Sequence, residues 1–287
     1  MTQGVSSPQG SWLTPDWDVA PNVHALSTLR GGGLSAEPYA SFNLAQHVGD
    51  DPEHVRANRA LLRAAAKLPS EPLWLEQVHG IHVVEHPGPA VTGAVPPRAD
   101  AAVAFGPDRV CVVMTADCLP VVFADRAGTR IGVAHAGWRG LVGGVLEATV
   151  AALHAEPDQL VAWLGPAIGP AAFEVGTEVR DAFIARDAAN DAAFVRNEAG
   201  RFQADLYRLA RRALARVGVH RVSGGGCCTQ REAADFFSFR RDGGRTGRMA
   251  TLAWLAPPPP HPQRFARRAR ANLTHIPGTA RSRTTLE

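Results

Sequence analysis

The segment VCVVMTADCLPVVF, residues 110–123, constrains the fold of this chain more than any other stretch. Its apolar, β-branched residues are typical of a buried strand, and such a strand normally stays apolar until it turns. Here Asp117, Cys118 and Pro120 interrupt the run. Because proline cannot donate to a sheet ladder, we expect a bulge, a bend or a sheet edge at this point. Bulges often lie beside active sites, where they re-aim side chains.

Expected strands and helices interleave along the chain, which indicates a mixed α/β fold of sheets layered with helices. Residues 110–125 and 129–137 are predicted to form a hairpin, so a purely parallel sheet is disfavoured. Further strands are expected at 22–29, 72–86 (a strand pair or one bent strand), 99–105, 160–170 and, as a final pair, within 219–255. Helices are expected at 51–68, 141–155, 178–187 and 203–218.

The chain of 287 residues is long enough for one large domain with a sizeable core. We expect a loose arm over residues 1–21 and a single domain over 22–256. Residues 257–287 begin with PPPPHP and are rich in arginine, with little apolar surface to bury. This segment is therefore predicted to be a disordered tail.

The basic character of the chain is confined to its end. The tail 257–287 holds six Arg and one Glu, whereas the remainder has 24 basic and 26 acidic residues. A near-neutral body gives no reason to expect nucleic acid as a partner. The sequence shows neither a signal peptide nor an apolar run near the roughly 20 residues of a membrane helix. We expect a cytoplasmic protein without membrane contact, and a monomer is favoured.

Cysteine and lysine usage narrows the chemistry. The four cysteines form no C-x-x-C pair, which argues against a disulfide-stapled secreted scaffold. Lys67 is the only lysine. Schiff-base catalysis and a phosphate-binding P-loop both need a placed lysine, so both are disfavoured.

Three short segments place a reactive or metal-ligating side chain beside a glycine or proline, at the end or in a break of an expected strand. They are LEQVHG, TADCLP and AHAGWRG, with His79, Cys118 and His135. The last two lie on the two arms of the expected hairpin, so their proximity is plausible, whereas His79 must join through tertiary packing. Two His and one Cys are zinc-type ligands that leave a fourth position open. Such a metal would lower the pKa of bound water to about 7 or polarise a substrate oxygen.

Other interpretations of the same residues stay open. A buried Cys is often an inert small hydrophobe, and a His within a strand is often only hydrogen-bonded structure. Alternatively His135 or His79 could deprotonate Cys118, which would then attack a carbonyl as a thiolate. The basic, glycine-rich segment RRDGGRTGR, residues 240–248, is either a solvated turn or an anion-binding loop.

A series of motifs lies between about residue 22 and 255. They are LRGGGLS, SFNLAQHVGD, NRALL, LEQVHG, MTADCLPVVF, AHAGWRGL, WLGPAIGP with FEVG, FFSFRRD and TGRMA. Together, and in this order, they resemble the YfiH family, whose members are also called laccase-domain or polyphenol-oxidase-like proteins and are described as purine nucleoside phosphorylases. The sequence departs from the family at Leu29, at Gln230 and at the additional thiol of Cys227.

This resemblance implies a single α/β domain in which His79, Cys118 and His135 bind a metal, usually zinc, with copper also possible. It implies phosphorolysis of adenosine, inosine, guanosine and S-methyl-5′-thioadenosine, with nucleoside and phosphate as small-molecule partners and adenosine deamination as a second activity. The matching motifs also suggest a set of substrate or phosphate contacts, namely Asn43, Arg56, Gln77 and Arg240.

Three alternative functions remain at this point. The first is a cysteine hydrolase acting on an amide or peptide, for example in editing a cell-wall precursor. The second is a non-enzymatic binding module stabilised by zinc, which chelation would unfold. The third is copper-dependent oxidation of polyphenols, although the 11 histidines include no H-x-H pair.

Overall fold

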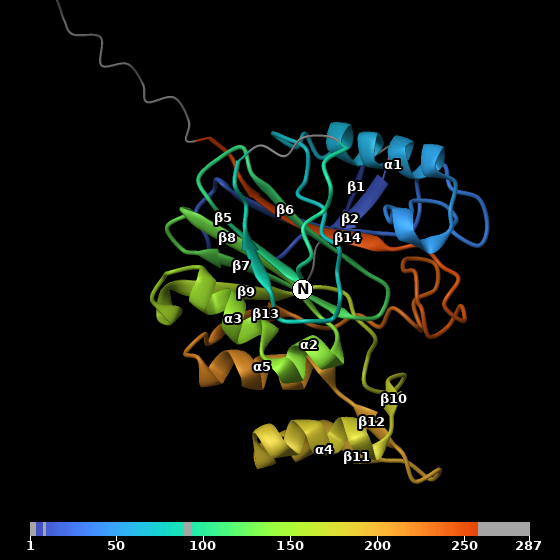
Figure 1. The fold of residues 1–287 in the computed structure, drawn as a ribbon, viewed down its shortest axis with the longest axis vertical. Coiled ribbons are helices and arrows are strands. Elements are labelled where there is room, and N and C mark those ends of the chain that lie inside the picture. Colours follow the sequence, from blue (N-terminus) through green and yellow to red (C-terminus); the bar gives the residue numbers. More distant parts are fainter. Residues whose placement is uncertain (1–3, 8–9, 89–92, 258–287) are drawn as a thin grey trace, which may run out of the picture. The chain divides into compact units, whose positions relative to one another are not determined.

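A computed structural model describes residues 4–7, 10–88 and 93–257 (Figure 1). The expected disordered tail therefore lies, except for Pro257, outside the described residues. The helices are α1 (Pro52–Ala65), α2 (Trp138–Gly143), α3 (Val145–Ala152), α4 (Thr177–Arg186) and α5 (Leu206–Arg216), with 3-10 turns η1 (Gln46–Val48), η2 (Pro157–Gln159) and η3 (Ala188–Ala193). The strands are β1 (Gly4–Ser7), β2 (Gly10–Leu13), β3 (Val23–Thr28), β4 (Val83–Glu85), β5 (Ala101–Phe105), β6 (Val110–Thr115), β7 (Leu119–Asp125), β8 (Arg130–Ala136), β9 (Leu160–Leu164), β10 (Glu174–Val175), β11 (Phe194–Arg196), β12 (Phe202–Ala204), β13 (Arg221–Gly224) and β14 (Met249–Leu255).

The described strands form three sheets, which confirms the mixed α/β class. A six-stranded sheet has the order β13-β9-β7-β8-β5-β4, and a five-stranded sheet has the order β1-β2-β3-β14-β6. A small sheet of order β10-β12-β11 lies beside α4. Antiparallel pairs dominate, and among the strands described here only the β13–β9 and β4–β5 pairs are parallel. None of the helices in the described part of the chain is long and apolar enough to cross a bilayer.

The two large sheets pack face to face, and helices cover their outer faces (Figure 1). Between the sheets lies an apolar layer that includes Cys111, Val133 and Trp163. Helices α2, α3 and α5 cover the other face of the six-stranded sheet, whereas α1 covers the five-stranded sheet. Both faces of β6 and β7 are thus buried, which is why their sequences are continuous apolar runs rather than alternating ones.

The run 110–123 is two strands in different sheets, not one interrupted strand. β6 belongs to the five-stranded sheet and β7 to the six-stranded sheet. The chain bends sharply between them at Ala116–Cys118, and Asp117 adopts φ 89°. Pro120 lies near the start of β7, where its carbonyl accepts a hydrogen bond from the backbone N–H of Gly165 at 2.9 Å. The expected bend is therefore present, and it passes the chain from one sheet to the other.

Other expectations had mixed outcomes. The β7–β8 hairpin is confirmed, and so is the helix capped by Asp51, whose carboxylate accepts from the N–H of Glu53. The expected helix over 141–155 is wrong as one element, because the chain breaks at Gly144 (φ 105°) between α2 and α3. A side chain at Gly144 would require a strained left-handed conformation and would meet Arg186 at 2.9 Å.

Three sheet assignments also need correction. β13 and β14 do not pair with each other, because β13 extends the six-stranded sheet and β14 lies in the five-stranded sheet. Within the expected loose arm, residues 4–7 and 10–13 instead form a hairpin whose second strand pairs with β3. The segment 72–86 contains one strand, β4, and otherwise only isolated bridges.

Candidate metal centre

His79, Cys118 and His135 lie together. Their ligand atoms are all within 4.8 Å of one another, and Cys118 Sγ is 3.8 Å from His79 Nε2. The two imidazole rings meet edge to face with centroids 4.8 Å apart. The three residues come from different parts of the chain. His79 lies in the loop before β4, Cys118 in the bend between β6 and β7, and His135 near the end of β8. Two nitrogens and one sulfur, with a fourth position open to solvent or substrate, are a donor set that fits zinc.

The loop that carries His79 folds around the carboxylate of Asp100. The backbone N–H groups of Val78, His79 and Gly80 donate to its two oxygens at 3.2, 2.9 and 2.6 Å. His79 adopts φ 60° to follow this path. Three convergent amides satisfy a fully buried carboxylate, so Asp100 acts as the centre around which the loop is shaped.

The same carboxylate orients His135. Asp100 Oδ1 lies 2.9 Å from His135 Nδ1, which leaves Nε2 of the ring free to face Cys118 and His79. Burial favours the neutral form of Asp100, but the hydrogen bonds from His135 and from the Gly80 amide hold the pKa of this carboxyl below its usual value. A carboxylate behind a ligating histidine fixes the tautomer and raises the basicity of the ligand nitrogen.

Asp117 shapes the bend that presents Cys118. Its carboxylate accepts from Thr229 Oγ1 at 2.6 Å, from Ser238 Oγ at 3.0 Å and from the backbone N–H of Arg240 at 2.7 Å. These bonds tie the bend to the loop 225–248. The side chain of Asp117 is buried and its carboxylate accepts all three of these hydrogen bonds, so its role is structural and not catalytic.

Gly137 follows His135 and lies against the other two donors. A Cβ atom at this position would be 2.8 Å from His79 Cδ2 and 3.1 Å from Cys118 Sγ. Any side chain would therefore displace a donor. This close approach explains the glycine of the AHAG segment.

The electrostatics favour a thiolate at Cys118. Burial alone would raise the pKa of the thiol, yet the two neighbouring imidazoles lower it to about 6. Burial alone would lower the pKa of His135, but the charge of Cys118 and the hydrogen bond with Asp100 raise this pKa to about 9. A thiolate beside imidazoles is the form that binds a metal, and it is also the form that attacks a carbonyl.

The three donors open into a cavity of about 350 Å³. Its polar wall contains several cationic or ionisable groups, and its apolar wall contains aromatic rings. Besides the three donors, the polar group consists of His47, Gln77, Thr115, Asp117, Arg139, Arg240 and Arg248, and the aromatic group of Trp138, Phe173 and Phe239. The cavity thus offers cations for an anion and flat faces for a ring.

Two of the four suggested substrate contacts line this cavity. Gln77 also forms a pair of hydrogen bonds with the backbone of Met114, donating to the carbonyl at 2.9 Å and accepting from the N–H at 2.8 Å. Arg240 Nη1 donates to the carbonyl of Glu174 at 3.1 Å, and its guanidinium lies 5.6 Å from the ring centroid of Phe173.

The other two suggested substrate contacts, Asn43 and Arg56, do not line this cavity. Asn43 is fully buried, and its side-chain oxygen accepts from the backbone N–H of Arg248 at 3.0 Å, so it supports the cavity wall from behind. Arg56 lies on the exposed side of α1, pairs with Glu53 and lines a different cavity.

Sequence reasoning did not single out His47 or Arg139, and it included Arg248 only as the last residue of the basic segment 240–248. Each is contained in a motif quoted above, SFNLAQHVGD, AHAGWRGL or TGRMA, so a signal was present. The Arg248 guanidinium donates from Nη1 to the carbonyls of Thr246 and Gly247, and burial lowers its pKa. The closeness of these three side chains depends on packing between distant segments.

Comparison with known proteins agrees with the resemblance drawn from the motifs. Residues 24–256 match the family described as multi-copper polyphenol oxidoreductase laccase. Purine nucleoside phosphorylase YfiH of Escherichia coli (strain K12) is 53% identical over 243 residues, which cover 85% of this chain and 98% of that protein. Purine nucleoside phosphorylase PA4543 of Pseudomonas aeruginosa is 53% identical over 246 residues, with the same coverage.

Solved structures show the same relationship. The crystal structure of Neisseria meningitidis protein NMB0706 matches with a TM-score of 0.80 at 50% identity, covering 85% of this chain and 98% of that one. YlmD from Geobacillus stearothermophilus matches with a TM-score of 0.77 at 28% identity, covering 88% and 98%. The chain therefore belongs to the YfiH family, whose model is described as multi-copper polyphenol oxidoreductase laccase.

Proposed function

We propose that this chain is a metal-dependent purine nucleoside phosphorylase whose catalytic domain spans residues 22–256. The observation that carries the proposal is the meeting of Arg139, Arg240 and Arg248 with the His/Cys/His group in one cavity. Phosphorolysis needs an anion and a nucleoside held together, and this cavity offers cations for the first and aromatic faces for the second. The names of the relatives at about half identity support the same assignment.

In phosphorolysis a phosphate oxygen forms a bond to the anomeric carbon of the ribose while the bond from that carbon to the purine nitrogen breaks. The electron pair of the broken bond leaves with the purine, which takes up a proton. The guanidinium forks would hold phosphate on one face of the sugar. Phe173, Phe239 and Trp138 would position the purine through contact with its ring.

His47, which lines the same cavity, would help the departing purine. Burial, together with the charges of Arg248 and Arg59, lowers the pKa of this histidine. The imidazole is therefore uncharged at neutral pH and can donate one hydrogen bond to a ring nitrogen of the purine.

The metal would be held by His79, Cys118 and His135, with zinc as the expected ion and copper as the alternative. When bound, it supplies a Lewis acid at the cavity wall. Asp100 would keep His135 oriented toward it, and the proximity of both imidazoles would keep Cys118 deprotonated. The expected substrates are adenosine, inosine, guanosine and S-methyl-5′-thioadenosine, with hydrolytic deamination of adenosine as a second activity. A cytoplasmic monomer remains part of this proposal.

Product analysis with adenosine tests the proposal. The protein is incubated in phosphate and in phosphate-free buffer, beside a Cys118→Ala variant and a Cys227→Ser control that removes a half-buried thiol outside the cavity. We expect adenine and ribose 1-phosphate only with phosphate, in the parent and the control but not in Cys118→Ala. Inosine in either buffer would establish deamination. Absence of all these products with adenosine, inosine and methylthioadenosine would refute the assignment, and elemental analysis distinguishes zinc from copper.

One observation favours a second candidate, a cysteine hydrolase. Cys118 Sγ lies 3.8 Å from His79 Nε2, and its pKa is lowered to about 6, as for an activated nucleophile. This alternative predicts amide hydrolysis that persists after complete metal removal and stops on alkylation of the thiol. The phosphorylase proposal predicts that metal removal and alkylation each abolish phosphate-dependent turnover.

A further inference from the structure

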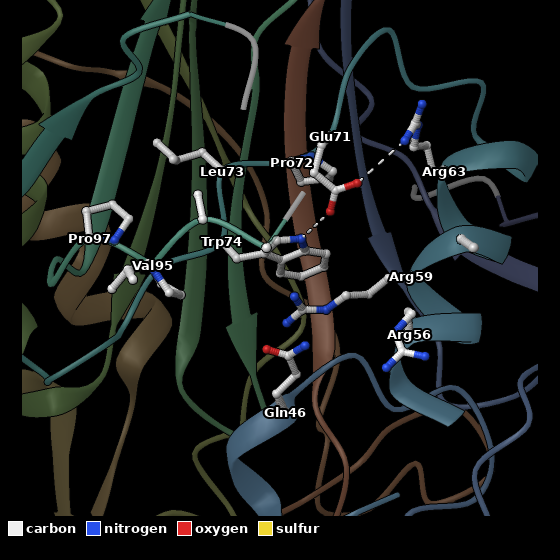
Figure 2. A pocket seen from close by; sticks show the side chains of 14 residues that line it. Gln46, Arg56, Arg59, Arg63, Glu71, Pro72, Leu73, Trp74, Val95 and Pro97 are labelled. Carbon is white, nitrogen blue, oxygen red and sulfur yellow. Dashed lines mark hydrogen bonds and ion pairs between the residues drawn. The ribbon is translucent and has the colours of Figure 1, made fainter. Parts of the chain in front are cut away.

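A second cavity, of about 530 Å³, lies between α1 and the segments 71–74 and 93–97. It shares no lining residue with the metal cavity. Figure 2 shows Arg56, Arg59 and Arg63 of α1 on one side and Leu73, Val95 and Pro97 on the other, with Trp74, Glu71 and Pro72 between them. We call this the α1 cavity. It combines a cationic wall with an apolar wall, and the proposed phosphorolysis uses neither.

The cationic wall follows from helical spacing. Arg56, Arg59 and Arg63 are three and four residues apart, so they emerge from one face of α1. The buried residues of this helix are Val55, Asn58 and Leu62, and Leu62 packs in the apolar cluster of the five-stranded sheet. The guanidinium groups of these three arginines therefore lie together along the cavity, on one side of the helix.

Arg59 is the inner member of this group. Its side chain lies beside Trp74 (Figure 2), with the guanidinium carbon 3.6 Å from the ring centroid. Its Nε donates to the carbonyl of Leu44 at 3.0 Å. Among the described residues, neither terminal nitrogen has a hydrogen-bond acceptor. Burial lowers the pKa of this guanidinium to about 10, although Glu71 opposes the shift. The stacked cation is thus held rigidly, with donors left for a ligand.

The charge of the wall is balanced only in part by the protein. Glu71 is the one carboxylate among the lining residues, against three arginines, so the formal charge of the lining is +2. Glu53, outside the lining, pairs with Arg56 and offsets one of these charges. Glu71 Oε1 accepts from Trp74 Nε1 at 2.9 Å, and its Oε2 lies 3.7 Å from Arg63. A phosphate monoester carries about two negative charges at neutral pH and three acceptor oxygens, which complements this wall.

We propose that the α1 cavity is a binding site for a small-molecule phosphate monoester, separate from the metal cavity. The arginine forks take the phosphate oxygens, and the apolar wall takes the sugar or ring that carries the phosphate. The volume suits such a ligand, because small-molecule sites commonly measure about 300–1,000 Å³. A nucleoside monophosphate and a sugar phosphate share this chemistry.

Isothermal titration of the full chain with adenosine 5′-monophosphate, ribose 5-phosphate, adenosine and inorganic phosphate tests the proposal. We expect at least one monoester to bind at least about tenfold more tightly than inorganic phosphate, a difference of about 1.4 kcal/mol. Preference for the nucleotide over the sugar phosphate would show that the apolar wall holds a base, whereas equal affinity would show that the sugar suffices.

Variants locate the site. Arg59→Gln and Arg63→Gln should each weaken monoester binding about tenfold through loss of a charged fork. The side chain of Arg63 is half exposed, so its variant is informative even if Arg59→Gln folds poorly. Arg126→Gln, which removes an equivalent partly exposed charge on the β7–β8 turn, should bind as the parent does.

A matched change in the metal cavity separates the two sites. Arg240→Gln should leave monoester binding at the α1 cavity intact. Loss of binding in Arg240→Gln with retention in Arg59→Gln and Arg63→Gln would overturn the proposal, because the ligand would then occupy the metal cavity. The proposal would also be overturned if neither monoester bound to the protein at millimolar concentration. Neither result depends on whether the chain is a phosphorylase.

Discussion

Asp100 Oδ1 lies 2.9 Å from Nδ1 of His135, and the same carboxylate gathers the amides of the loop that carries His79. One buried acid therefore positions two of the three donor side chains. We predict that Asp100→Asn weakens metal binding about 10–100-fold, the range seen when a group behind a ligand is changed. Competition against a chromogenic zinc chelator measures the affinity.

Asp125→Asn is the matched control for that change. Asp125 is also buried and also accepts backbone hydrogen bonds, from Thr129 at 2.7 Å and Arg130 at 2.9 Å, but it shapes the far turn of the β7–β8 hairpin. Its variant should lose stability with little change in zinc affinity. Equal zinc affinity in Asp100→Asn and the parent would show that Asp100 only supports the fold.

Gly137→Ala is predicted to disable the metal centre through a single methyl group. The new Cβ would lie 2.8 Å from His79 Cδ2, so the imidazole or the backbone must move. Misplacement of a reacting group by about 1 Å can reduce the rate about 100-fold. We expect zinc affinity and turnover to fall at least about tenfold, as measured by chelator competition and nucleoside phosphorolysis.

Gly31→Ala provides the comparison, because no atom lies within 4 Å of the Cβ that it would add. Gly31→Ala should retain the zinc affinity and the turnover of the parent. If Gly137→Ala bound zinc as tightly as Gly31→Ala does, the donors could not be as close to Gly137 as the structure places them.

The sequence allowed one part of the centre to be anticipated. Cys118 and His135 lie on or beside adjacent strands of a hairpin, and the register that pairs Pro120 with His135 brings them to the same end. Local turn chemistry was enough to predict that hairpin. His79 was also singled out beside its glycine, but its proximity to the other two could not be derived from the sequence, because its loop is folded around Asp100, a residue with no local signal of its own.

Other features escaped local reasoning for a related reason. Periodicity identified 110–123 as buried β structure, but it could not show that β6 and β7 belong to different sheets, since both faces of each are covered. Likewise β13 and β14 are strands, yet neither pairs with the other. Arg56 was assigned to the substrate because it lies near a family motif, whereas the direction of α1 places it in another cavity.

Asp117→Asn tests the connection between the bend and the anion-binding wall. The carboxylate accepts from Thr229, Ser238 and the Arg240 backbone, and loss of its charge weakens all three bonds. We expect the free energy of unfolding to fall by about 2–4 kcal/mol, given that hydrogen bonds to a charged group contribute about 1.5–3 kcal/mol each. Urea titration measures this change.

The same variant should raise the KM for phosphate more than it lowers kcat, because the proposed role of Arg240 is to hold phosphate. Asp235→Asn, an exposed change in the same loop, should alter neither stability nor KM. A variant that is destabilised but keeps the parental KM for phosphate would show that Arg240 keeps its position without Asp117.

The last prediction concerns pH and a histidine outside the metal centre. His86 is almost fully buried beside β4, and burial, followed by the charge of Arg109, lowers its pKa to about 4. An unfolded chain would protonate this histidine near pH 6.5. Between these values the unfolded state binds more protons, so His86 contributes a loss of stability as the pH falls from about 6.5 to 4.

His86→Gln removes this titration, and the variant should therefore lose less stability than the parent between pH 6.5 and 4, as followed by urea unfolding at several pH values. His82→Gln is the matched control, because His82 lies four residues earlier with an exposed side chain. It should follow the parental profile. Parallel stability profiles for the parent and both variants would mean that the pKa of His86 is the same in the folded and unfolded states. A negative partner would then have to compensate the effect of burial on this histidine.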